Sequence, residues 1–287
     1  MGPGFDVLGL ALQLRNELHV RVLDKKSGPP LIRIVGEGEK SLPSDERNGI
    51  YKTMKGLFAR ANKKMPKVDL VCVNRIPLAR GLGSSSAAYL SGLLAANRLL
   101  GDRYSKKDIL NFATRLEGHP DNVAPALLGG VRASGVYDAE VATAALPTPK
   151  LKLVVAVPAF ELSTKKARRV VPKSISMKDA IANLSAVALM TAALSGDDAL
   201  LGRVLNDRWH EPYRSKLIPG FYQVKRAALK SGAVGVILSG AGPTMLAFAR
   251  AGHAKSVAKA MTNAFLKAGV ESKTMTLEID RKGAVVK

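Results

Sequence analysis

The sequence predicts an α+β fold of two domains, and three observations lead to this prediction. Strand-like and helix-like stretches follow one another along the 287 residues without the strict strand–helix–strand order of a parallel sheet. Hydrophobic residues make up 47% of the chain, which is enough for a sizeable core. Two prolines in "ALPTPK" (145–150) break the pattern near its middle. We therefore expect one domain at residues 1–147 and a second at 148–287.

The first half is expected to begin with a sheet and to continue in helices. Stretches that alternate or run apolar over the length of a strand are found at 17–23, 31–35 and 68–73. From residue 84 the spacing becomes helical in "SSSAAYLSGLLAANRLLG", and Gly101 is expected to end that helix. Shorter helices are expected at about 106–116 and 122–128.

The second half also contains stretches with helical spacing and stretches with the alternating or continuous apolar pattern of strands. Helices are expected at about 178–195, 197–207 and 219–231, and strands at 151–158, 233–240, 244–249 and 271–279. Val257, Met261 and Phe265 are spaced by four, so they share one face of a further helix, which Gly269 is expected to end.

The chain carries a formal charge of +21, from 44 Lys and Arg against 23 Asp and Glu. Such a charge is typical of nucleic-acid-binding proteins, whose basic residues usually accompany aromatic stacking platforms or a recognition motif. Here aromatic residues are 5% of the chain and the basic residues are scattered, apart from clusters such as "KKARR" (165–169). We therefore favour a basic surface around a site for small anions and expect no nucleic-acid partner.

Neither a membrane location nor secretion is expected. The longest apolar runs, such as "LKLVVAVPAF" (151–160), are well short of the roughly 20 residues that cross a bilayer. The first residues lack a basic stretch before their apolar segment and include Asp6, unlike a secretory signal. A lone cysteine, Cys72, excludes an internal disulfide and suits a reducing compartment. We therefore expect a cytoplasmic protein.

A glycine-rich turn, "PLARGLGSSS" (77–86), leads into the long helix. Gly81 and Gly83 allow the main chain to approach a ligand closely, and the free N–H groups of the following helix favour a phosphate. No lysine follows the second glycine, as a Walker loop requires, and such turns also serve simply as helix caps. Among the serines at 84–86, one is expected to cap the helix and another to ligate Mg²⁺.

A second polar segment is bounded by apolar residues. Within "LEGHPDNVAPALLGG" (116–130) it contains Glu117, His119, Asp121 and Asn122. Pro120 is expected to begin a helix, and one interpretation makes His119 and Asp121 simply capping and turn residues. In the other, Glu117 is a second Mg²⁺ ligand, because a hard cation between phosphates prefers carboxylate oxygen. A zinc site is not expected, because one histidine without a nearby cysteine cannot complete it.

The third segment, "SGAGPTM" (239–245), lies between two expected strands. A tight hairpin explains it in part, because glycine is needed wherever φ is positive. An ordinary hairpin does not need three small residues, a proline and a threonine. We therefore expect the main chain of this loop to pack against a ligand or against the first glycine loop.

Together these segments resemble the motifs of the GHMP kinase family, which includes galactokinases, homoserine kinases, mevalonate kinases and phosphomevalonate kinases. The resemblance rests on "PLARGLGSSSAA", "GPGFDVLGLAL" (2–12) and "SGAGPT" and spans nearly the whole chain. "GPGFDVLGLAL", "EGHPDNVAPALLGG", "STKKARRVVP" and "HEPYRSKLIPG" are similar to the homoserine kinase branch of that family. The resemblance implies a ribosomal-protein-S5-like N-terminal ATP-binding domain and a ferredoxin-like C-terminal domain, with ATP and substrate between them.

The resemblance also implies which residues bind ATP and Mg²⁺. The glycine–serine loop and the helix dipole would hold the triphosphate without a lysine, through Pro77, Leu78, Ala79, Arg80, Gly81, Leu82, Gly83, Ser84, Ser85, Ser86 and Ala87. A serine matching Ser85 and a glutamate matching Glu117 would hold Mg²⁺. Asn48, in "DERNGIY", resembles an asparagine that lies near the adenine.

The implied substrate residues surround an amino acid. They are Asp6, His119, Asn122, Thr164, Arg168, Arg214 and Gly240. Asp6 would pair with the ammonium group of L-homoserine, and Arg168 and Arg214 with its carboxylate, which a guanidinium can bind at two points. Asn122 would contact the hydroxyl that accepts phosphate, so Asn122 and Arg168 are the implied catalytic residues. Taken alone, each arginine in so basic a chain is equally compatible with a solvated surface charge.

The implied reaction is Mg²⁺-dependent transfer of the γ-phosphoryl group of ATP to the side-chain hydroxyl of L-homoserine, giving O-phospho-L-homoserine for threonine synthesis. Such a transfer depends chiefly on positioning and charge neutralisation, so no general base is assigned. A GHMP kinase for a sugar or isoprenoid intermediate would not need Arg168 and Arg214 to meet, and a nucleic-acid-binding module would leave Ser85 and Glu117 unused. Dimers are common in this family, so a homodimer is an expected assembly.

One departure from the family concerns the start of the sequence. Family members normally have a strand and a short segment ending in Ser-Ala-Asn-Leu before "GPGFD", and here Met1 stands in place of the leucine. The substrate-binding asparagine of that segment has no counterpart in this sequence. We therefore expect the N-terminal sheet to have a bare edge.

Overall fold

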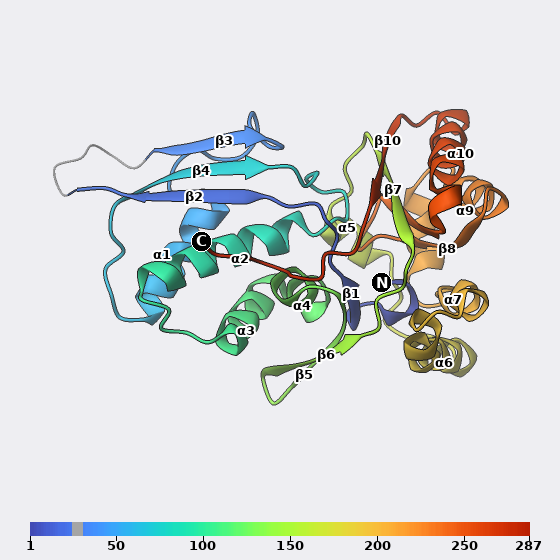
Figure 1. Ribbon diagram of the computed structural model, residues 1–287, viewed down its shortest axis with the longest axis horizontal. Coiled ribbons are helices and arrows are strands. Elements are labelled where there is room, and N and C mark those ends of the chain that lie inside the picture. The colour runs from blue at the N-terminus through green and yellow to red at the C-terminus, as the bar shows by residue number, and fades with distance from the viewer. Residues whose placement is uncertain (25–30) are drawn as a thin grey trace.

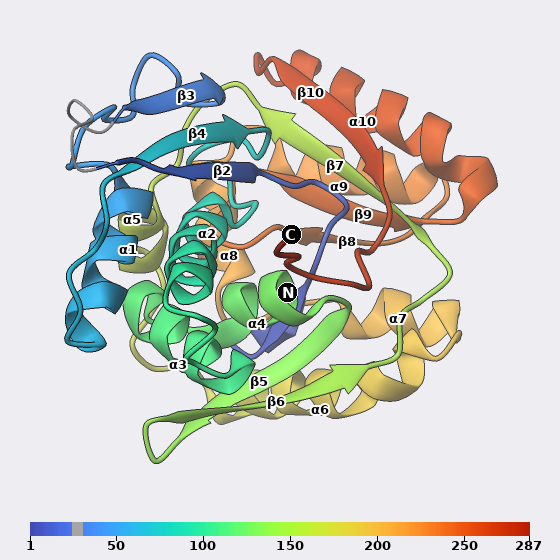
Figure 2. The same ribbon diagram turned by 60° about the vertical axis from the view of Figure 1, so that its left-hand side comes forward.

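The computed structural model describes residues 1–24 and 31–287 and has the expected α+β architecture (Figure 1). The first half contains, in chain order, η1 (Gly2–Gly4), β1 (Leu8–Leu10), β2 (Glu17–Val22), β3 (Ile32–Gly36), α1 (Gly49–Arg60), β4 (Val68–Asn74), α2 (Ser84–Leu99), α3 (Lys106–Glu117), α4 (Pro120–Leu128), β5 (Val131–Tyr137) and β6 (Glu140–Leu146). One sheet has the order β2-β4-β3 and the other β1-β5-β6. In both ribbon views the four helices lie between these sheets (Figures 1 and 2).

The core of the first half forms where these layers meet. Leu70 of β4, Met54 of α1, Leu90 of α2 and Ile109 of α3 are all buried in one cluster. The burial of β4 alternates along the strand, as expected when one face of a sheet packs on helices. This packing fixes the start of α2 and the junction between α3 and α4.

The second half is the expected ferredoxin-like unit. It contains β7 (Lys152–Pro158), α5 (Thr164–Arg169), α6 (Met177–Leu194), α7 (Asp198–Val204), α8 (Glu211–Arg214), η2 (Ser215–Leu217), α9 (Phe221–Lys230), β8 (Ala233–Leu238), β9 (Met245–Ala249), η3 (Ala251–His253), α10 (Ala254–Lys267) and β10 (Ser272–Leu277). The four strands form an antiparallel sheet in the order β10-β7-β9-β8, so the first and third strands of this half are central.

Both faces of this sheet are covered by helices. Val154 and Ala156 of β7 pack in the cluster that contains Phe221 of α9 and Phe265 of α10. The alternate residues of β7 belong to a second cluster with α6 and α7, which also contains Leu8 of β1. Because β1 shares this second cluster, the start of the chain is packed between the two halves.

The last residues of the chain return from β10 to the first half (Figure 1). Ile279 forms a β-bridge with Leu12, and the carboxylate of Asp280 lies 2.6 Å from the guanidinium of Arg15. Further on, the amide of Ala284 donates to the carbonyl of Leu127 at 3.2 Å. The boundary at residues 147 and 148 falls in the connector between β6 and β7 and stays a prediction.

α6 is unusual in being apolar on two faces. By length and by a mean hydropathy of 1.2 over 18 residues, it is long and apolar enough to cross a membrane, unlike the continuous runs considered in the sequence. Its buried residues pack inside the chain and include Ala186, Met190 and Leu194. Of the residues in this window 28% are buried, so α6 packs one face on the second half of the chain and exposes the rest of its surface.

Several elements of the first half were not expected from the sequence, and they include β1, α1 and the β5–β6 hairpin. α1 follows the spacing of buried Ile50, Met54 and Leu57, which is a helical signal that was overlooked. The β5–β6 hairpin turns at Asp138 and Ala139, which both have positive φ, instead of the Asn-Gly pair that usually marks such a turn. Its strands are also rich in alanine, glycine and serine, which are poor predictors of strands.

β2 is one of the two edge strands of the sheet β2-β4-β3. Among the described residues it pairs with β4 alone. A groove of about 800 Å³ borders β2 and is also lined by β1, α2 and the last residues of the chain.

Candidate functional site

A cavity of about 100 Å³ lies between the two halves, where the three glycine-containing or polar segments of the sequence meet. Its lining residues include the following predicted site residues: Asp6, Pro77, Ala79, Arg80, Gly81, Leu82, Gly83, Ser84, Ser85, Glu117, His119, Asn122, Thr164, Arg168, Arg214 and Gly240. Residues separated by more than 200 positions in the sequence are therefore brought to one place.

The glycine-rich turn forms one wall of this cavity. Gly81 and Gly83 have φ of 75° and 76°, in the left-handed region that favours glycine. Gly83 is the N-cap of α2, and no side chain caps this helix, so the expectation that one of the serines does so is wrong. The left-handed Gly83 begins the helix instead. The first N–H groups of α2 therefore have no side-chain acceptor and are available to an anion at the positive end of the helix.

The loop between β8 and β9 packs against this turn, as the sequence suggested. The Ser239 hydroxyl donates to the Gly81 carbonyl at 2.9 Å. A Cβ added to Gly81 would lie 2.2 Å from the Ser239 carbonyl oxygen, so no larger residue fits there. The amide of Thr244 also donates to the Arg80 carbonyl at 3.3 Å. The small residues of "SGAGPT" thus allow two main chains to touch, and the segment is also a β-hairpin.

Ser85 and Glu117 face each other at the end of this wall. The Ser85 hydroxyl donates to Oε2 of Glu117 at 2.9 Å, although the two residues come from α2 and α3. A hydroxyl beside a carboxylate, next to free helix N–H groups, is a donor set that suits a hard divalent cation shared with phosphate oxygens. No lysine among the described residues lines the cavity.

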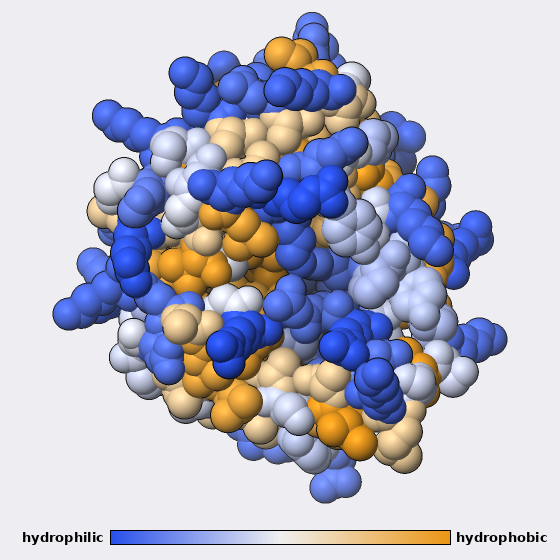
Figure 3. Space-filling model, turned by 90° about the vertical axis from the view of Figure 1, so that its right-hand side faces the viewer, coloured by the Kyte–Doolittle hydropathy of each residue, from blue (hydrophilic) through white to orange (hydrophobic). Residues whose placement is uncertain are grey.

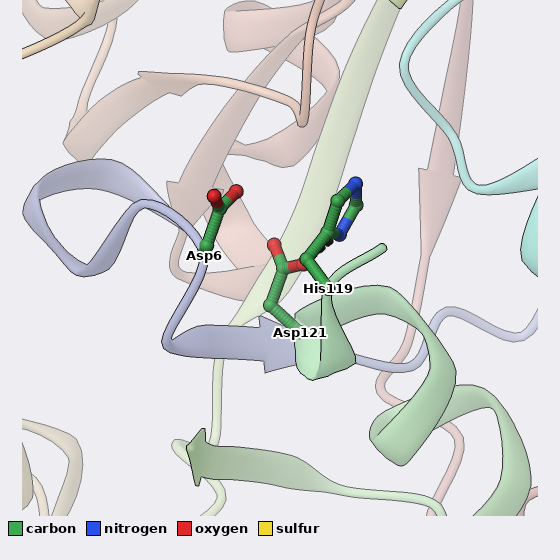
Figure 4. Close-up of side chains that lie close together, drawn as sticks. All are labelled: Asp6, His119 and Asp121. Atoms are coloured by element: carbon green, nitrogen blue, oxygen red, sulfur yellow. Dashed lines mark hydrogen bonds and ion pairs between the residues drawn. The ribbon is translucent and has the colours of Figure 1, made fainter. Parts of the chain in front are cut away.

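A second group with acidic side chains lines the same cavity. Asp6, His119 and Asp121 offer atoms within 4.8 Å of one another (Figure 4). Nδ1 of His119 lies 2.6 Å from Oδ1 of Asp121, so Asp121 orients the ring; His119 occupies the N-cap position of α4, but no side chain caps this helix. Burial alone would lower the pKa of His119, but the hydrogen bond and charge of Asp121 raise it above its usual value.

Asp6 and Arg168 form a two-point ion pair across the cavity. The two guanidinium nitrogens of Arg168 donate to the two oxygens of Asp6 at 3.1 and 2.8 Å. This hydrogen bonding raises the pKa of Arg168 against the opposing effect of its partial burial. Both oxygens of Asp6 are thereby engaged by Arg168. We therefore interpret Asp6, His119 and Asp121 as part of a polar binding pocket and not as a metal site.

Arg214 is the buried cation of the site, with only 3% of its surface exposed. Its Nε donates to the Ala167 carbonyl at 3.1 Å, and Nη1 donates to the Gly240 carbonyl at 3.2 Å. Burial, followed by the nearby charge of Arg168, lowers the pKa of Arg214 to about 10. It is therefore still charged at neutral pH, and a bound anion would relieve the cost of burying that charge.

Phe5 connects the two arginines. The centre of its ring lies 4.9 Å from the Arg214 guanidinium carbon and 5.4 Å from that of Arg168. The ring also stacks on His210 at 4.9 Å between centroids. Its φ of 26° is rare for a residue with a side chain, and this turn of the main chain presents Phe5 and Asp6 to the same cavity.

Sequence reasoning missed Phe5, Asp121 and His210 as residues of the cavity. Phe5 and His210 lie inside the quoted motifs, so the signal was present, but an aromatic ring or a buried histidine is more often a core residue. Conversely, Leu78, Ser86 and Ala87 do not line this cavity, and Ser86 is fully buried. The side chain of Asn48 caps α1 by accepting from the Ile50 amide at 2.9 Å, and it does not line the cavity either.

His210 predicts a pH dependence of stability. Its Nε2 contacts the Gly2 carbonyl at 2.9 Å and its Nδ1 lies 3.4 Å from Nη1 of Arg214, an arrangement that requires a neutral ring. Burial, against the opposing charge of Asp207, lowers its pKa to about 4. Because the unfolded chain binds this proton from about pH 6.5, stability is lost as the pH falls from 6.5 to about 4.

The size of this effect is testable with one variant. The pKa difference corresponds to roughly 3 kcal/mol of unfolding free energy between pH 7 and pH 4. We expect His210→Gln to lose about that much less stability over this range in urea unfolding. Both proteins share every other titrating group, so equal pH slopes would show that His210 is not held neutral.

The comparisons with known proteins agree with this geometry. The GHMP kinases N terminal domain matches residues 48–130, and the GHMP kinases C terminal domain matches residues 189–268. The chain is 43% identical to a homoserine kinase of Carboxydothermus hydrogenoformans over 99% of its own length and 92% of the relative's. It is also 43% identical to a homoserine kinase of Moorella thermoacetica, over 100% and 96% of the two lengths.

The solved structures give the same result. A homoserine kinase from Cytophaga hutchinsonii superposes with a TM-score of 0.88 at 34% identity, covering 98% of this chain and 92% of the other. A mevalonate kinase of L. major, solved with R-mevalonate, superposes with a TM-score of 0.72 at 14% identity, covering 96% and 89%, and shows the shared fold alone. The chain therefore belongs to the GHMP kinase family, the ATP-dependent small-molecule kinases.

Proposed function

We propose that this protein is a homoserine kinase, which transfers the γ-phosphoryl group of ATP to the side-chain hydroxyl of L-homoserine. The observation that carries the proposal is the meeting of Asp6, Arg168 and Arg214 in one cavity beside the glycine-rich turn. One carboxylate and two guanidiniums match the ammonium and carboxylate groups of an amino acid. The 43% identity to homoserine kinases supports the same substrate.

The residues of the chain contribute mainly positioning. The free N–H groups of α2 and the helix dipole hold the phosphates, and Mg²⁺ held by Ser85 and Glu117 would neutralise charge on them. Asn122, at the start of α4 and on the cavity wall, holds the acceptor hydroxyl. His119 and Thr164 complete the wall around the substrate. No general base is assigned, because a loose phosphoryl-transfer transition state needs little assistance in removing the proton.

The experiment is an ADP-release assay with four acceptors. We expect ATP turnover with L-homoserine and little with mevalonate, shikimate or galactose. Turnover with mevalonate, shikimate or galactose but not with L-homoserine would show that the chain is a GHMP kinase with a different acceptor. Steep salt-dependent binding to DNA or RNA, without turnover on any acceptor, would favour a nucleic-acid-binding module instead.

The cellular setting stays a prediction. The thiol of Cys72 is buried, and burial raises its pKa to about 11, so it is an inert core residue and suits the reducing conditions of the cytoplasm. Hydrophilic side chains are spread between apolar patches over the face shown in Figure 3, and the whole chain carries a formal charge of +21. We propose that this charge attracts anionic substrates.

We also propose that α6 forms a homodimer interface. Met177, Ile181 and Leu184 expose 77%, 55% and 71% of their surfaces on one side of α6. No residue from 180 to 196 is charged, so this stretch of α6 adds no pair of like charges to a contact between two copies.

This interface predicts the effect of one substitution. We expect the protein to sediment as a dimer, and Leu184→Glu to sediment as a monomer, because it places a charge in each copy of the contact. Leu266→Glu introduces the same charge on α10, where Leu266 is also exposed, and should leave the dimer intact. A wild-type chain that is monomeric at micromolar concentrations would contradict the proposal.

A further inference from the structure

Arg80, in the glycine-rich turn, has a guanidinium whose nitrogens are all used within the protein. Nε donates to the Pro158 carbonyl at 3.0 Å, Nη2 to the Ala159 carbonyl at 2.7 Å, and Nη1 to the Leu78 carbonyl at 3.0 Å. Glu161 adds a longer ionic contact at 3.5 Å, and the Arg80 side chain is only 15% exposed. Pro158 ends β7, so one side chain of the first half holds the end of a strand of the second half.

The main chain of the same turn is held from two other directions. The Leu162 amide donates to the Ala79 carbonyl at 3.1 Å, beyond the end of β7. From the β8–β9 loop, Thr244 donates to the Arg80 carbonyl at 3.3 Å, and Ser239 donates to the Gly81 carbonyl at 2.9 Å. Residues 79, 80 and 81 thus each accept a hydrogen bond from the second half.

This attachment also explains an unfavourable backbone conformation. Ala79 has a φ of 50°, which a residue with a Cβ adopts only when its surroundings impose it. Two hydrogen bonds between the turn and the second half impose it here, one from Arg80 to the Pro158 carbonyl and one from the Leu162 amide to the Ala79 carbonyl. The shape of the turn, and hence the direction of the first N–H groups of α2, is therefore set by the second half of the chain.

We propose that Arg80 is a positioning residue that fixes the glycine-rich turn to the end of β7, and that it does not bind the phosphates of ATP with its charge. The proposal rests on the proposed kinase activity. This role separates Arg80 from the other residues of the turn, whose main-chain N–H groups would contact the phosphates of the nucleotide. A guanidinium suits this task because its planar fork reaches several carbonyl oxygens at once, whereas a lysine ammonium is a compact point charge.

The test compares Arg80→Lys with Arg80→Ala, because lysine keeps the charge and loses the fork. We expect both variants to raise the ATP KM by about tenfold or more, to a similar extent, with the homoserine KM changed less than threefold. Isothermal titration with ADP should show the same weakening. Glu161→Gln removes the exposed ionic contact and leaves the three carbonyl contacts, so it should bind ATP like the wild type.

Each alternative has a distinct result. Near-normal ATP binding in Arg80→Lys, with strong loss in Arg80→Ala, would show that the charge binds phosphate and would overturn the proposal. An unchanged ATP KM in Arg80→Ala would also overturn it. If Arg80→Ala does not fold, the lysine variant decides alone, because the two roles predict opposite results for it. A wild-type chain without ATP turnover on any acceptor would contradict the proposed kinase activity. The comparison of the Arg80 variants is made in an active enzyme, so it tests the role of Arg80 separately.

Discussion

Replacing Arg214 by alanine is expected to raise the homoserine KM by about 100-fold and to change the ATP KM less than threefold. Arg214 lines the cavity, is buried, and is held by the carbonyls of Ala167 and Gly240. Losing a charge-assisted contact to the substrate carboxylate costs roughly 2–3 kcal/mol, which corresponds to about a 100-fold loss of affinity. Steady-state kinetics with each substrate varied in turn measures both constants.

Two further variants make the result specific to Arg214. Arg169→Ala removes one positive charge from the exposed side of α5 and should leave both KM values near wild type. Arg214→Lys keeps the charge without the fork and should give an intermediate homoserine KM. Because Arg214 is buried, the thermal unfolding of each variant must be followed in parallel. An unchanged homoserine KM in folded Arg214→Ala would remove Arg214 from the carboxylate site.

Replacing Glu117 by glutamine is expected to lower kcat by about 10³-fold and to raise the Mg²⁺ concentration needed for half-maximal rate. The carboxylate beside the Ser85 hydroxyl is the anionic member of the proposed cation site, and glutamine keeps its shape but not its charge. Loss of one charge that stabilises a phosphoryl-transfer transition state costs about 4 kcal/mol, and hence about that factor in rate.

A titration of Mg²⁺ at saturating ATP and homoserine measures this effect. Ser85→Ala should show a smaller shift in the same direction, because a neutral hydroxyl contributes less than a carboxylate. Glu140, on the β5–β6 hairpin, has an exposed carboxylate that pairs with Lys107 of α3, and Glu140→Gln serves as the control. A Glu117→Gln enzyme with the wild-type Mg²⁺ requirement would show that the cation is held elsewhere.

Much of the fold was predictable because its elements carry local signals. The long helix from Ser84 and the helix that contains Val257, Met261 and Phe265 were found from their periodic spacing. The β5–β6 hairpin was not found, because its strands contain few residues with strong strand preference and its turn lacks glycine. The bridge of Ile279 back to Leu12 has no local signal at all, since it is a contact between the two ends of the chain.

The candidate site was predictable in its composition but less so in its contacts. The motifs supplied Ser85, Glu117, Asp6, Arg168 and Arg214 from positions far apart in the sequence, and the structure brings all five to one cavity. The sequence could not indicate that two of them pair directly in the described structure, as Asp6 and Arg168 do. Such pairings depend on distances between elements, which only the packing of the two halves determines.

The contacts between the β8–β9 loop and the glycine-rich turn were likewise predictable only in part. The excess of small residues in "SGAGPT" predicted a close approach of two main chains, and that approach is made to Gly81. Arg80, by contrast, was expected only as one residue of the turn that would hold the triphosphate. Its partners are the carbonyls of Leu78, Pro158 and Ala159, which no sequence pattern distinguishes from other carbonyls.

We propose that one cavity recognises both the ammonium and the carboxylate of an amino-acid acceptor. The most direct measurement compares kcat/KM for L-homoserine with that for 4-hydroxybutanoate, which lacks the ammonium, and for 3-amino-1-propanol, which lacks the carboxylate. Since each analogue leaves a charged group of the site without its partner, we expect each to react at least about 100-fold less efficiently. Either analogue reacting within threefold of homoserine would contradict the assignment of Asp6, Arg168 and Arg214.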